Sequence, residues 1–289
     1  MWCRYANLPL ERQRIARWMA PLAALVLAGS LSLPGHTVEV LPGTDGEGPA
    51  APLATTIPVL RTAFIQLVTK RSYPDDTRLA HLQAAARQAF ATADLPWPAG
   101  ELFLLIDRHP QSQEAVVALA TEAGGWEVIG SSLISTGKPG SYDHFITPLG
   151  LFSNGDHHSF RAEGTFNDNG IRGYGLKGLR VFDLGWVPAE KGWEPPGTIP
   201  IRLQVHATDP VLEQRLGTPA SKGCIRLDAG LNRFLDQYSV LDARFEAAQA
   251  TTGVRPWFWL PDRTPTPWSG SWVVIVDVSR ATPPPVPAP

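Results

Sequence analysis

The sequence predicts a mostly-β domain with a helical N-terminal extension. Three short runs, at residues 101–107, 115–120 and 126–135, are rich in apolar side chains and are bounded by Pro, Gln/Ser or Gly clusters, which is typical of strands. A fourth run with the same character lies at residues 271–278. Residues 59–94 instead repeat apolar side chains at helical spacing. The helices therefore precede a domain built from short strands.

Two helices are expected within residues 59–94, because the repeat is interrupted by Tyr73-Pro74-Asp75-Asp76. The apolar positions that mark them are Leu60, Phe64, Leu67 and Val68 in the first helix and Leu79, Leu82, Ala86 and Phe90 in the second. A further helix is expected at residues 228–238. Long loops are expected over residues 167–197, where glycine and aromatic residues are frequent.

The N-terminal residues predict an export signal. Residues 1–17 carry four arginines against one acid, Glu11, and residues 18–33 contain no charge. A basic segment, a short apolar core and the small residues Ala28-Gly29-Ser30 form the pattern of a secretory signal peptide. We assign residues 1–34 to this signal and expect a periplasmic protein. An uncleaved membrane anchor is the alternative, although the apolar run is shorter than the roughly 20 residues that a span needs.

Composition divides the rest of the chain. Residues 35–58 are rich in Gly, Pro and Ala and are predicted to be a linker. Residues 59–98 form the helical extension, and residues 99–278 the main domain. Residues 279–289 are a proline-rich tail, a composition with no need to fold.

The charge balance argues against a nucleic-acid partner. The chain has a net charge of −2, and residues 1–17 contribute +3 (four arginines minus Glu11), so the remainder carries −5. A protein that binds nucleic acid electrostatically would present a basic surface instead.

Cysteine usage points to one reactive residue. The chain has two cysteines, Cys3 and Cys224, and the signal assignment leaves Cys224 as the only thiol of the exported part. A solitary thiol in an oxidising compartment is either buried and inert or chemically used. Its neighbours favour use, because Gly223 leaves room for a substrate backbone, while Lys222 and Arg226 favour the thiolate.

A histidine that could act as a base precedes Cys224 in the sequence. His206 closes a run in which Ile201, Leu203 and Val205 alternate with polar residues, so it lies at the end of a predicted strand. Cys224 follows eighteen positions later. A thiol nucleophile requires a nearby base to take its proton, and we interpret His206 as that base.

These residues resemble the signature of the YkuD-type L,D-transpeptidases. In that signature, a His is followed after a fixed gap by Ser/Thr-His-Gly-Cys, an apolar residue and Asn or Arg. Here His206 is followed, after fourteen residues, by Ser221-Lys222-Gly223-Cys224-Ile225-Arg226. A second landmark of the family, Ser/Thr-Gly-Lys ahead of Thr-Pro-x-Gly, is matched by residues 135–138 and 147–150. The resemblance covers roughly residues 100–245. Lys222 departs from it by replacing a second His, and Ala207 by replacing a Gly.

The resemblance implies a fold and a site. The fold is a β-sandwich or open barrel of short strands, with which the predicted strands are compatible. Cys224 is the nucleophile that forms a thioester, and His206 is the proton donor and acceptor. The backbone N–H groups around Lys222, Gly223 and Cys224 supply the oxyanion hole. Ser221 positions the histidine or the loop, and Arg226 braces the site or meets a substrate carboxylate. No cofactor and no metal is implied.

The resemblance also implies a substrate class. L,D-transpeptidases act on peptidoglycan stem peptides, release D-Ala and transfer the acyl group to an amine. The acceptor is a second stem, a free D-amino acid or a lysine of a lipoprotein. Lys222 and Arg226 suit stems that carry several carboxylates. Two alternatives stay open: an L,D-carboxypeptidase or amidase on the same scaffold, and a non-catalytic module that binds the cell wall.

Three other features have simpler interpretations. Asp156-His157-His158 looks like a metal cluster, but its position beside Asn154-Gly155 favours a surface turn. His144 belongs to a loop, with a substrate contact as the alternative. Most of the tryptophans are expected to close the core or loops, with stacking on glycan sugars as the alternative. Phe182, Trp186 and Trp193 are the candidates for a lid over the acyl pocket.

Overall fold

The computed structural model describes residues 55–278. The signal peptide, nearly all of the expected linker and the proline-rich tail lie outside the described residues. Within them, the chain forms two open β-sheets with α-helices packed against them, and neither sheet closes into a barrel. The expectation of a β-rich fold therefore holds in its coarse form, with more helix than a plain sandwich contains. None of the helices in this part of the chain is both long and apolar enough to cross a bilayer.

The two sheets are mixed. The five-stranded sheet has the order β3-β2-β1-β9-β4, and the four-stranded sheet has the order β5-β6-β7-β8. In each sheet one neighbouring pair is parallel, β1 with β9 and β7 with β8, and the remaining pairs are antiparallel. The strands are β1 (Leu102–Asp107), β2 (Glu114–Ala120), β3 (Trp126–Leu133), β4 (Gly150–Ser153), β5 (Phe160–Arg161), β6 (Arg180–Glu190), β7 (Thr198–Ala207), β8 (Ile225–Leu227) and β9 (Trp272–Val276).

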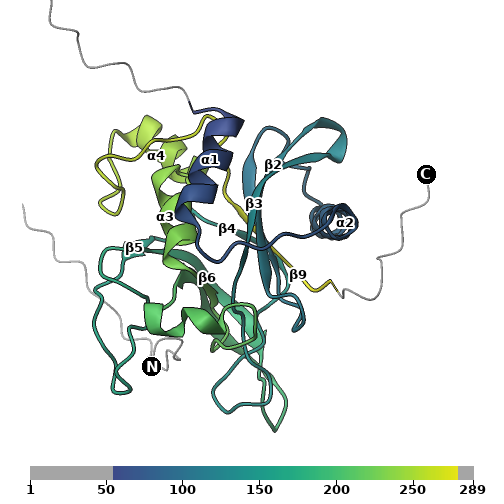
Figure 1. Ribbon diagram of the computed structural model, residues 1–289, viewed down its shortest axis with the longest axis vertical. Helices are drawn as coiled ribbons and strands as arrows, with labels where there is room; N and C mark the ends of the chain where they lie inside the picture. Colours follow the sequence, from purple (N-terminus) through teal and green to yellow (C-terminus); the bar gives the residue numbers. More distant parts are fainter. Residues whose placement is uncertain (1–54, 279–289) are drawn as a thin grey trace, which may run out of the picture. The chain divides into compact units, whose positions relative to one another are not determined.

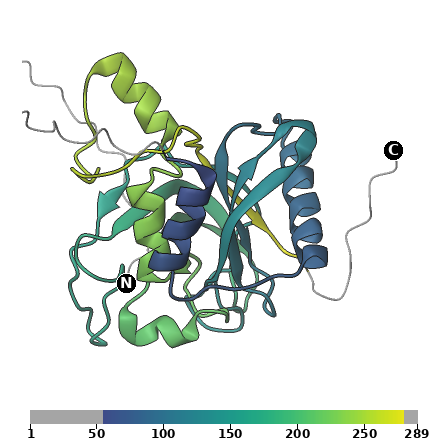
Figure 2. The ribbon, with the colours of Figure 1, turned by 45° about the horizontal axis from the view of Figure 1, so that its top comes forward.

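Helices lie on both sides of the five-stranded sheet. The helical segments are α1 (Ile57–Leu67), α2 (Asp76–Thr92), α3 (Ala229–Gln237) and α4 (Ala243–Thr252), with short 3₁₀ turns η1 (Glu122–Gly124) and η2 (Pro210–Arg215). In Figures 1 and 2, α2 lies against one face of the sheet, whereas α1 and α3 lie side by side on the other side.

Alternate side chains of the five-stranded sheet enter two different cores. Leu104 and Ile106 of β1 pack with α1, α3 and the inner face of the four-stranded sheet. Phe103 and Leu105, which point the opposite way, pack against α2. The helices α1 and α2 therefore share their cores with the strands and are integral to the same body.

One long strand lies where loops were expected. The second half of the glycine-rich segment 167–197 contains β6, which begins with six buried residues. Its pattern is hard to read from sequence because Gly185, with a φ of +88°, falls in a β-bulge and Pro188 follows it. The prediction of long loops was thus wrong over Arg180–Glu190. Helix α4 was also not predicted.

A buried arginine joins the four-stranded sheet to the segment that follows α3. Arg180 is fully buried at the start of β6, and its guanidinium lies 2.6 Å from Asp242 and 3.4 Å from Asp236. The guanidinium also lies over the rings of Phe182 and Phe258, at 4.6 and 4.7 Å from their centroids. Two carboxylates and two aromatic faces thus compensate a charge that has no access to water.

Candidate active site

His206 is placed by the alternation of β7. Leu203 and Val205 point into the core, so Gln204 and His206 point to the opposite face of the sheet. The ring Nδ1 lies 2.8 Å from the carbonyl oxygen of Ala207. Because a carbonyl oxygen only accepts, Nδ1 carries the hydrogen and Nε2 is left as the proton acceptor.

Cys224 lies next to the strand that carries His206. It immediately precedes β8, which runs parallel to β7 with Arg226 beside His206. Its Sγ lies 3.6 Å from the carbonyl oxygen of Arg202 on β7. Cys224 and His206 are each 4% exposed, and both line one cavity of about 260 Å³, which we call the Cys–His cleft. The structure therefore brings the predicted nucleophile and base to one cleft.

The loop before Cys224 is closed by Ser221. The Ser221 hydroxyl donates to the carbonyl oxygen of Cys224 at 2.5 Å and accepts from the N–H of Gly223 at 3.0 Å. Gly223 adopts a φ of +120°, and a Cβ there would come within 3.0 Å of Ile201 and 3.2 Å of Phe145. Ser221 thus closes the loop with two hydrogen bonds.

The N–H of Gly223, one of the expected oxyanion donors, already has an acceptor. It donates to Ser221 Oγ at 3.0 Å. An oxyanion role for this group requires that the bond to Ser221 opens first.

The second sequence landmark is joined to the nucleophile loop. Thr147 Oγ1 accepts from the N–H of Gly137 and donates to the carbonyl oxygen of Gly223, each at 2.8 Å. Ser135 and Arg226 exchange a pair of backbone hydrogen bonds, at 2.8 and 3.0 Å. The two Ser/Thr-containing segments therefore support the loop that holds Cys224.

Cationic side chains line the Cys–His cleft. They are Arg172, Arg215, Lys222 and Arg226, and no carboxylate is among the lining residues that the structure describes. Two of these charges are compensated nearby, because Lys222 Nζ lies 2.6 Å from Asp143 and a guanidinium nitrogen of Arg172 lies 3.5 Å from Asp209. Arg226 donates to the carbonyl oxygen of Ala220 at 3.1 Å, which braces the loop. The cleft favours a substrate that carries negative charge.

Burial keeps His206 neutral. Desolvation, followed by the nearby Arg226 charge, lowers the pKa of His206 from 6.5 to about 4, against an opposing effect of the hydrogen bond to Ala207. At neutral pH the imidazole is therefore unprotonated and able to accept a proton.

This lowered pKa makes stability depend on pH. The unfolded chain binds a proton on His206 below pH 6.5, whereas the folded chain does so only near pH 4. The stability linked to the neutral ring is thus present above pH 6.5 and is lost as the pH falls towards 4, by about 3 kcal/mol. Urea unfolding near pH 7 and pH 4.5 should show this loss in the wild type and a loss smaller by about 2–3 kcal/mol in His206→Gln. Equal losses in both proteins would contradict the assignment.

Two site residues were not predicted from the sequence. The hydroxyl of Tyr174 donates to Oε1 of Gln204 at 2.8 Å, and its ring meets the ring of His206. Gln204 could have been found, because the period of two along the strand places it on the same face as His206. Tyr174 could not, because it belongs to an irregular loop thirty residues earlier.

The three aromatic residues expected to form a lid lie away from the cleft. Phe182 is fully buried in the core, Trp186 lies on β6 and Trp193 packs on Phe145, and none of these three lines the cleft. Phe182 and Trp186 are held in β6, and the packing of Trp193 on Phe145 holds it outside the lining of the cleft. The loop that lines this side of the cleft is 167–174, and His144 lines the cleft too.

The acidic–histidine cluster is a surface turn. Asp156 pairs with Arg244, and His157 packs against Gly185, where a Cβ would come within 2.1 Å of the imidazole. Across residues 55–278, no group of three or more His, Cys, Asp or Glu side chains is arranged to hold a metal ion.

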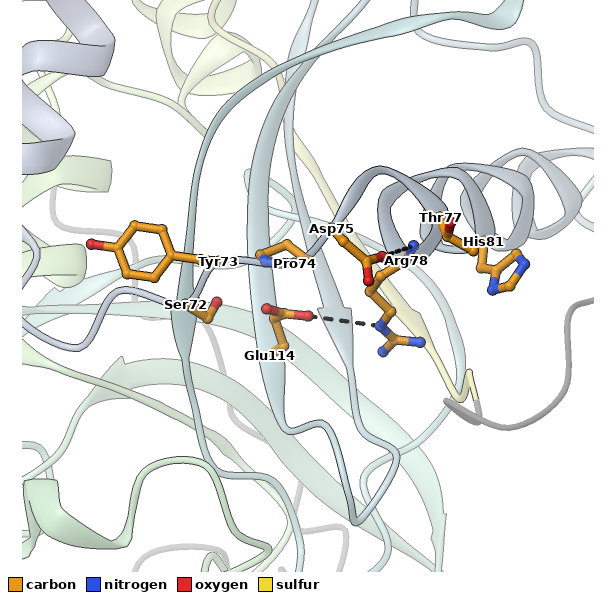
Figure 3. Close-up of a pocket in the computed structure, with 8 residues that line it drawn as sticks. All are labelled: Ser72, Tyr73, Pro74, Asp75, Thr77, Arg78, His81 and Glu114. Atoms are coloured by element: carbon orange, nitrogen blue, oxygen red, sulfur yellow. Dashed lines mark hydrogen bonds and ion pairs between the residues drawn. The ribbon is translucent and has the colours of Figure 1, made fainter.

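A larger cavity, of about 400 Å³, lies at the start of α2 and shares no lining residue with the Cys–His cleft. Figure 3 shows Arg78 and Glu114 facing each other, with Nε and Oε2 3.8 Å apart, and Tyr73 pointing away from them. Arg78 is buried and also bonds Asp107 and Ser112. These contacts tie the first turn of α2 to the ends of β1 and β2. The buried charges at this cavity therefore have a structural role.

Comparisons with known proteins show only distant structural similarity. No protein-family model matches the chain, and no curated protein matches it. Among solved structures, the chain is similar to an L,D-transpeptidase from Mycobacterium smegmatis, with 17% identity and a TM-score of 0.28. The match covers 61% of this chain and 58% of that chain, less than two thirds of its length.

Proposed function

We propose that the protein is an L,D-transpeptidase, a cysteine acyltransferase that acts on peptidoglycan stem peptides. One observation carries this proposal: Cys224 and His206, which are eighteen residues apart in the motif, line a single cleft. The bond from Nδ1 to Ala207 supports it, because that bond leaves Nε2 to take the thiol proton. We further propose that the protein works in the periplasm, where such stems are found.

The proposed reaction passes through a thioester. Nε2 of His206 takes the proton of the Cys224 thiol, and Sγ attacks the carbonyl carbon of the stem amide. When the tetrahedral intermediate collapses, the C–N bond breaks and Nε2 returns the proton to the departing D-Ala amine. An acceptor amine then attacks the thioester and passes a proton to Nε2. The C–S bond breaks, and the departing sulfur takes that proton from Nε2, which restores the thiol and the neutral imidazole. No metal or redox cofactor takes part in this scheme.

The charges of the cleft support an anionic substrate. Arg215 and Arg226 line it together with the compensated Lys222, and stem peptides carry several carboxylates. Arg226 lies beside His206 on the neighbouring strand, close enough to lower the pKa of that imidazole. We propose that Arg226 both braces the loop and attracts the acyl donor. The acceptor is a second stem, a D-amino acid or a lipoprotein lysine.

The nucleophile can be tested with a covalent probe and a substrate. We expect the purified protein to gain the mass of a carbapenem on the Cys224 peptide and to release D-Ala from tetrapeptide stems. Cys224→Ala should do neither, because no other group described at the cleft offers a thiol. Equal D-Ala release by the wild type and Cys224→Ala would show that the proposal is wrong.

Product analysis separates transfer from hydrolysis. A transpeptidase converts tetrapeptide stems into crosslinked dimers or exchanged peptides, whereas a carboxypeptidase gives only the shortened monomer. Mass spectrometry of the products distinguishes these outcomes on the same samples. A wall-binding module without activity would give neither product and no adduct.

A further inference from the structure

Tyr174 touches the proposed base without belonging to the motif. The ring centroids of Tyr174 and His206 lie 4.9 Å apart at an interplanar angle of 89°, so the edge of one ring meets the face of the other. The tyrosine ring also meets Phe160 edge-on at 5.4 Å. Such contacts favour one ring orientation over others. The imidazole therefore packs against a ring whose own orientation is fixed.

The hydroxyl of Tyr174 is tied to the strand that carries His206. It donates at 2.8 Å to Oε1 of Gln204, which is 3% exposed and lies on the same face of β7 as His206. A buried hydrogen bond of this kind resists movement of either partner, because breaking it leaves polar atoms unsatisfied. The ring of Tyr174 is thus anchored two residues from the imidazole that it contacts.

The backbone around Tyr174 is pressed onto the end of β7. Gly175 has a φ of +78°, and a Cβ there would come within 2.9 Å of the Thr208 carbonyl oxygen and 3.0 Å of the Ala207 side chain. On the other side, the N–H of Arg172 donates to the buried carboxylate of Asp209 at 2.7 Å. Both ends of this short segment are therefore held against the residues that follow His206.

We propose that Tyr174 is a positioning residue that holds the imidazole of His206 with Nδ1 towards the Ala207 carbonyl and Nε2 towards the Cys–His cleft. The inference rests on the role of His206 in the proposed function. The terminal torsion of a histidine has a broad, roughly two-fold profile, so packing must select the orientation. Without the tyrosine edge, the ring has room to turn and Nδ1 loses its fixed acceptor.

The test uses two readouts that need no peptidoglycan. The first is the ring nitrogen spectrum of His206, assigned by its disappearance in His206→Gln, which reports the fraction of the tautomer with hydrogen on Nδ1. The second is the rate at which iodoacetamide, a small neutral reagent, modifies Cys224, read from the mass of the Cys224 peptide. We expect Tyr174→Leu to mix the tautomers and to slow alkylation about three- to tenfold.

Two further variants break the same hydrogen bond from its two ends. Tyr174→Phe keeps the ring and Gln204→Leu keeps the tyrosine, so each should slow alkylation by about threefold and by the same amount. Tyr73→Leu, at an exposed tyrosine beside the other cavity, is the matched control and should behave as wild type. A wild-type tautomer fraction and alkylation rate in both Tyr174→Phe and Gln204→Leu would overturn the proposal, even if Tyr174→Leu does not fold.

The outcomes separate this proposal from the function itself. Wild-type protein that shows a single His206 tautomer but releases no D-Ala contradicts the proposed function and leaves the positioning intact. Protein that releases D-Ala, with identical His206 spectra in all three variants, contradicts the positioning alone.

Discussion

His206→Gln is expected to lower the rate of D-Ala release by about 10²–10⁴-fold, the range in which a positioned acid–base group contributes. Glutamine retains the size and polarity of the side chain but cannot take up and return a proton at Nε2. The thiolate of Cys224 must then form without that base, so the rate of acylation should rise with pH. In the wild type, acylation should persist to mildly acidic pH, because the pKa of His206 is about 4.

Initial rates of D-Ala release, followed from about pH 4 to pH 9, check this result. His81→Gln is the matched control, since His81 lines the cavity at the start of α2 and not the Cys–His cleft. Its profile should coincide with that of the wild type. A His206→Gln protein that retained the wild-type rate at pH 6 would exclude His206 as the base.

Arg180→Met should destabilise the protein by about 3–5 kcal/mol, the cost of removing one partner from a buried ion pair. The substitution removes the guanidinium that lies closest to Asp242, whereas Asp236 keeps its ion pair with Arg161. Burial already raises the pKa of Asp236, and the loss of Arg180 removes one of the charges that oppose this rise. Much of the penalty should therefore be relieved at acidic pH, where the carboxyl groups bind protons.

Denaturant unfolding at neutral pH measures this effect. Arg244→Met is the control, because Arg244 pairs with Asp156 at the surface, where the side chains are 43% and 53% exposed. An exposed pair of this kind contributes at most about 1 kcal/mol. Equal losses of unfolding free energy in the two variants would show that the buried ion pairs of Arg180 stabilise the protein no more than an exposed pair does.

Patterns within short stretches of the sequence predicted several strands and the two main candidate site residues. Apolar runs bounded by turn residues placed strands near β1, β2, β3 and β9, because a strand whose two faces both enter a core is apolar along most of its length. The spacing of the motif singled out Cys224 and His206. Patterns failed where glycine and proline interrupt a buried strand, as at Gly185 and Pro188 of β6.

Contacts between distant segments could not be predicted from the sequence. The ion pair of Lys222 with Asp143 joins residues 79 positions apart, and no pattern along the chain indicates it. The hydrogen bond between Tyr174 and Gln204 likewise joins residues 30 positions apart, and no sequence pattern indicates it. For that reason the candidate nucleophile and base were predictable, whereas the groups that orient them were not.

The support of the Gly223 carbonyl by Thr147, across 76 positions of the chain, bears on when the protein acquires its chemistry. Contacts between distant segments form late, because a long stretch of chain must be ordered before they close. We therefore expect the loop that holds Cys224 to reach its native conformation only in the last stages of folding. If the proposed chemistry is right, a nascent chain acquires a reactive thiol only once it is fully folded.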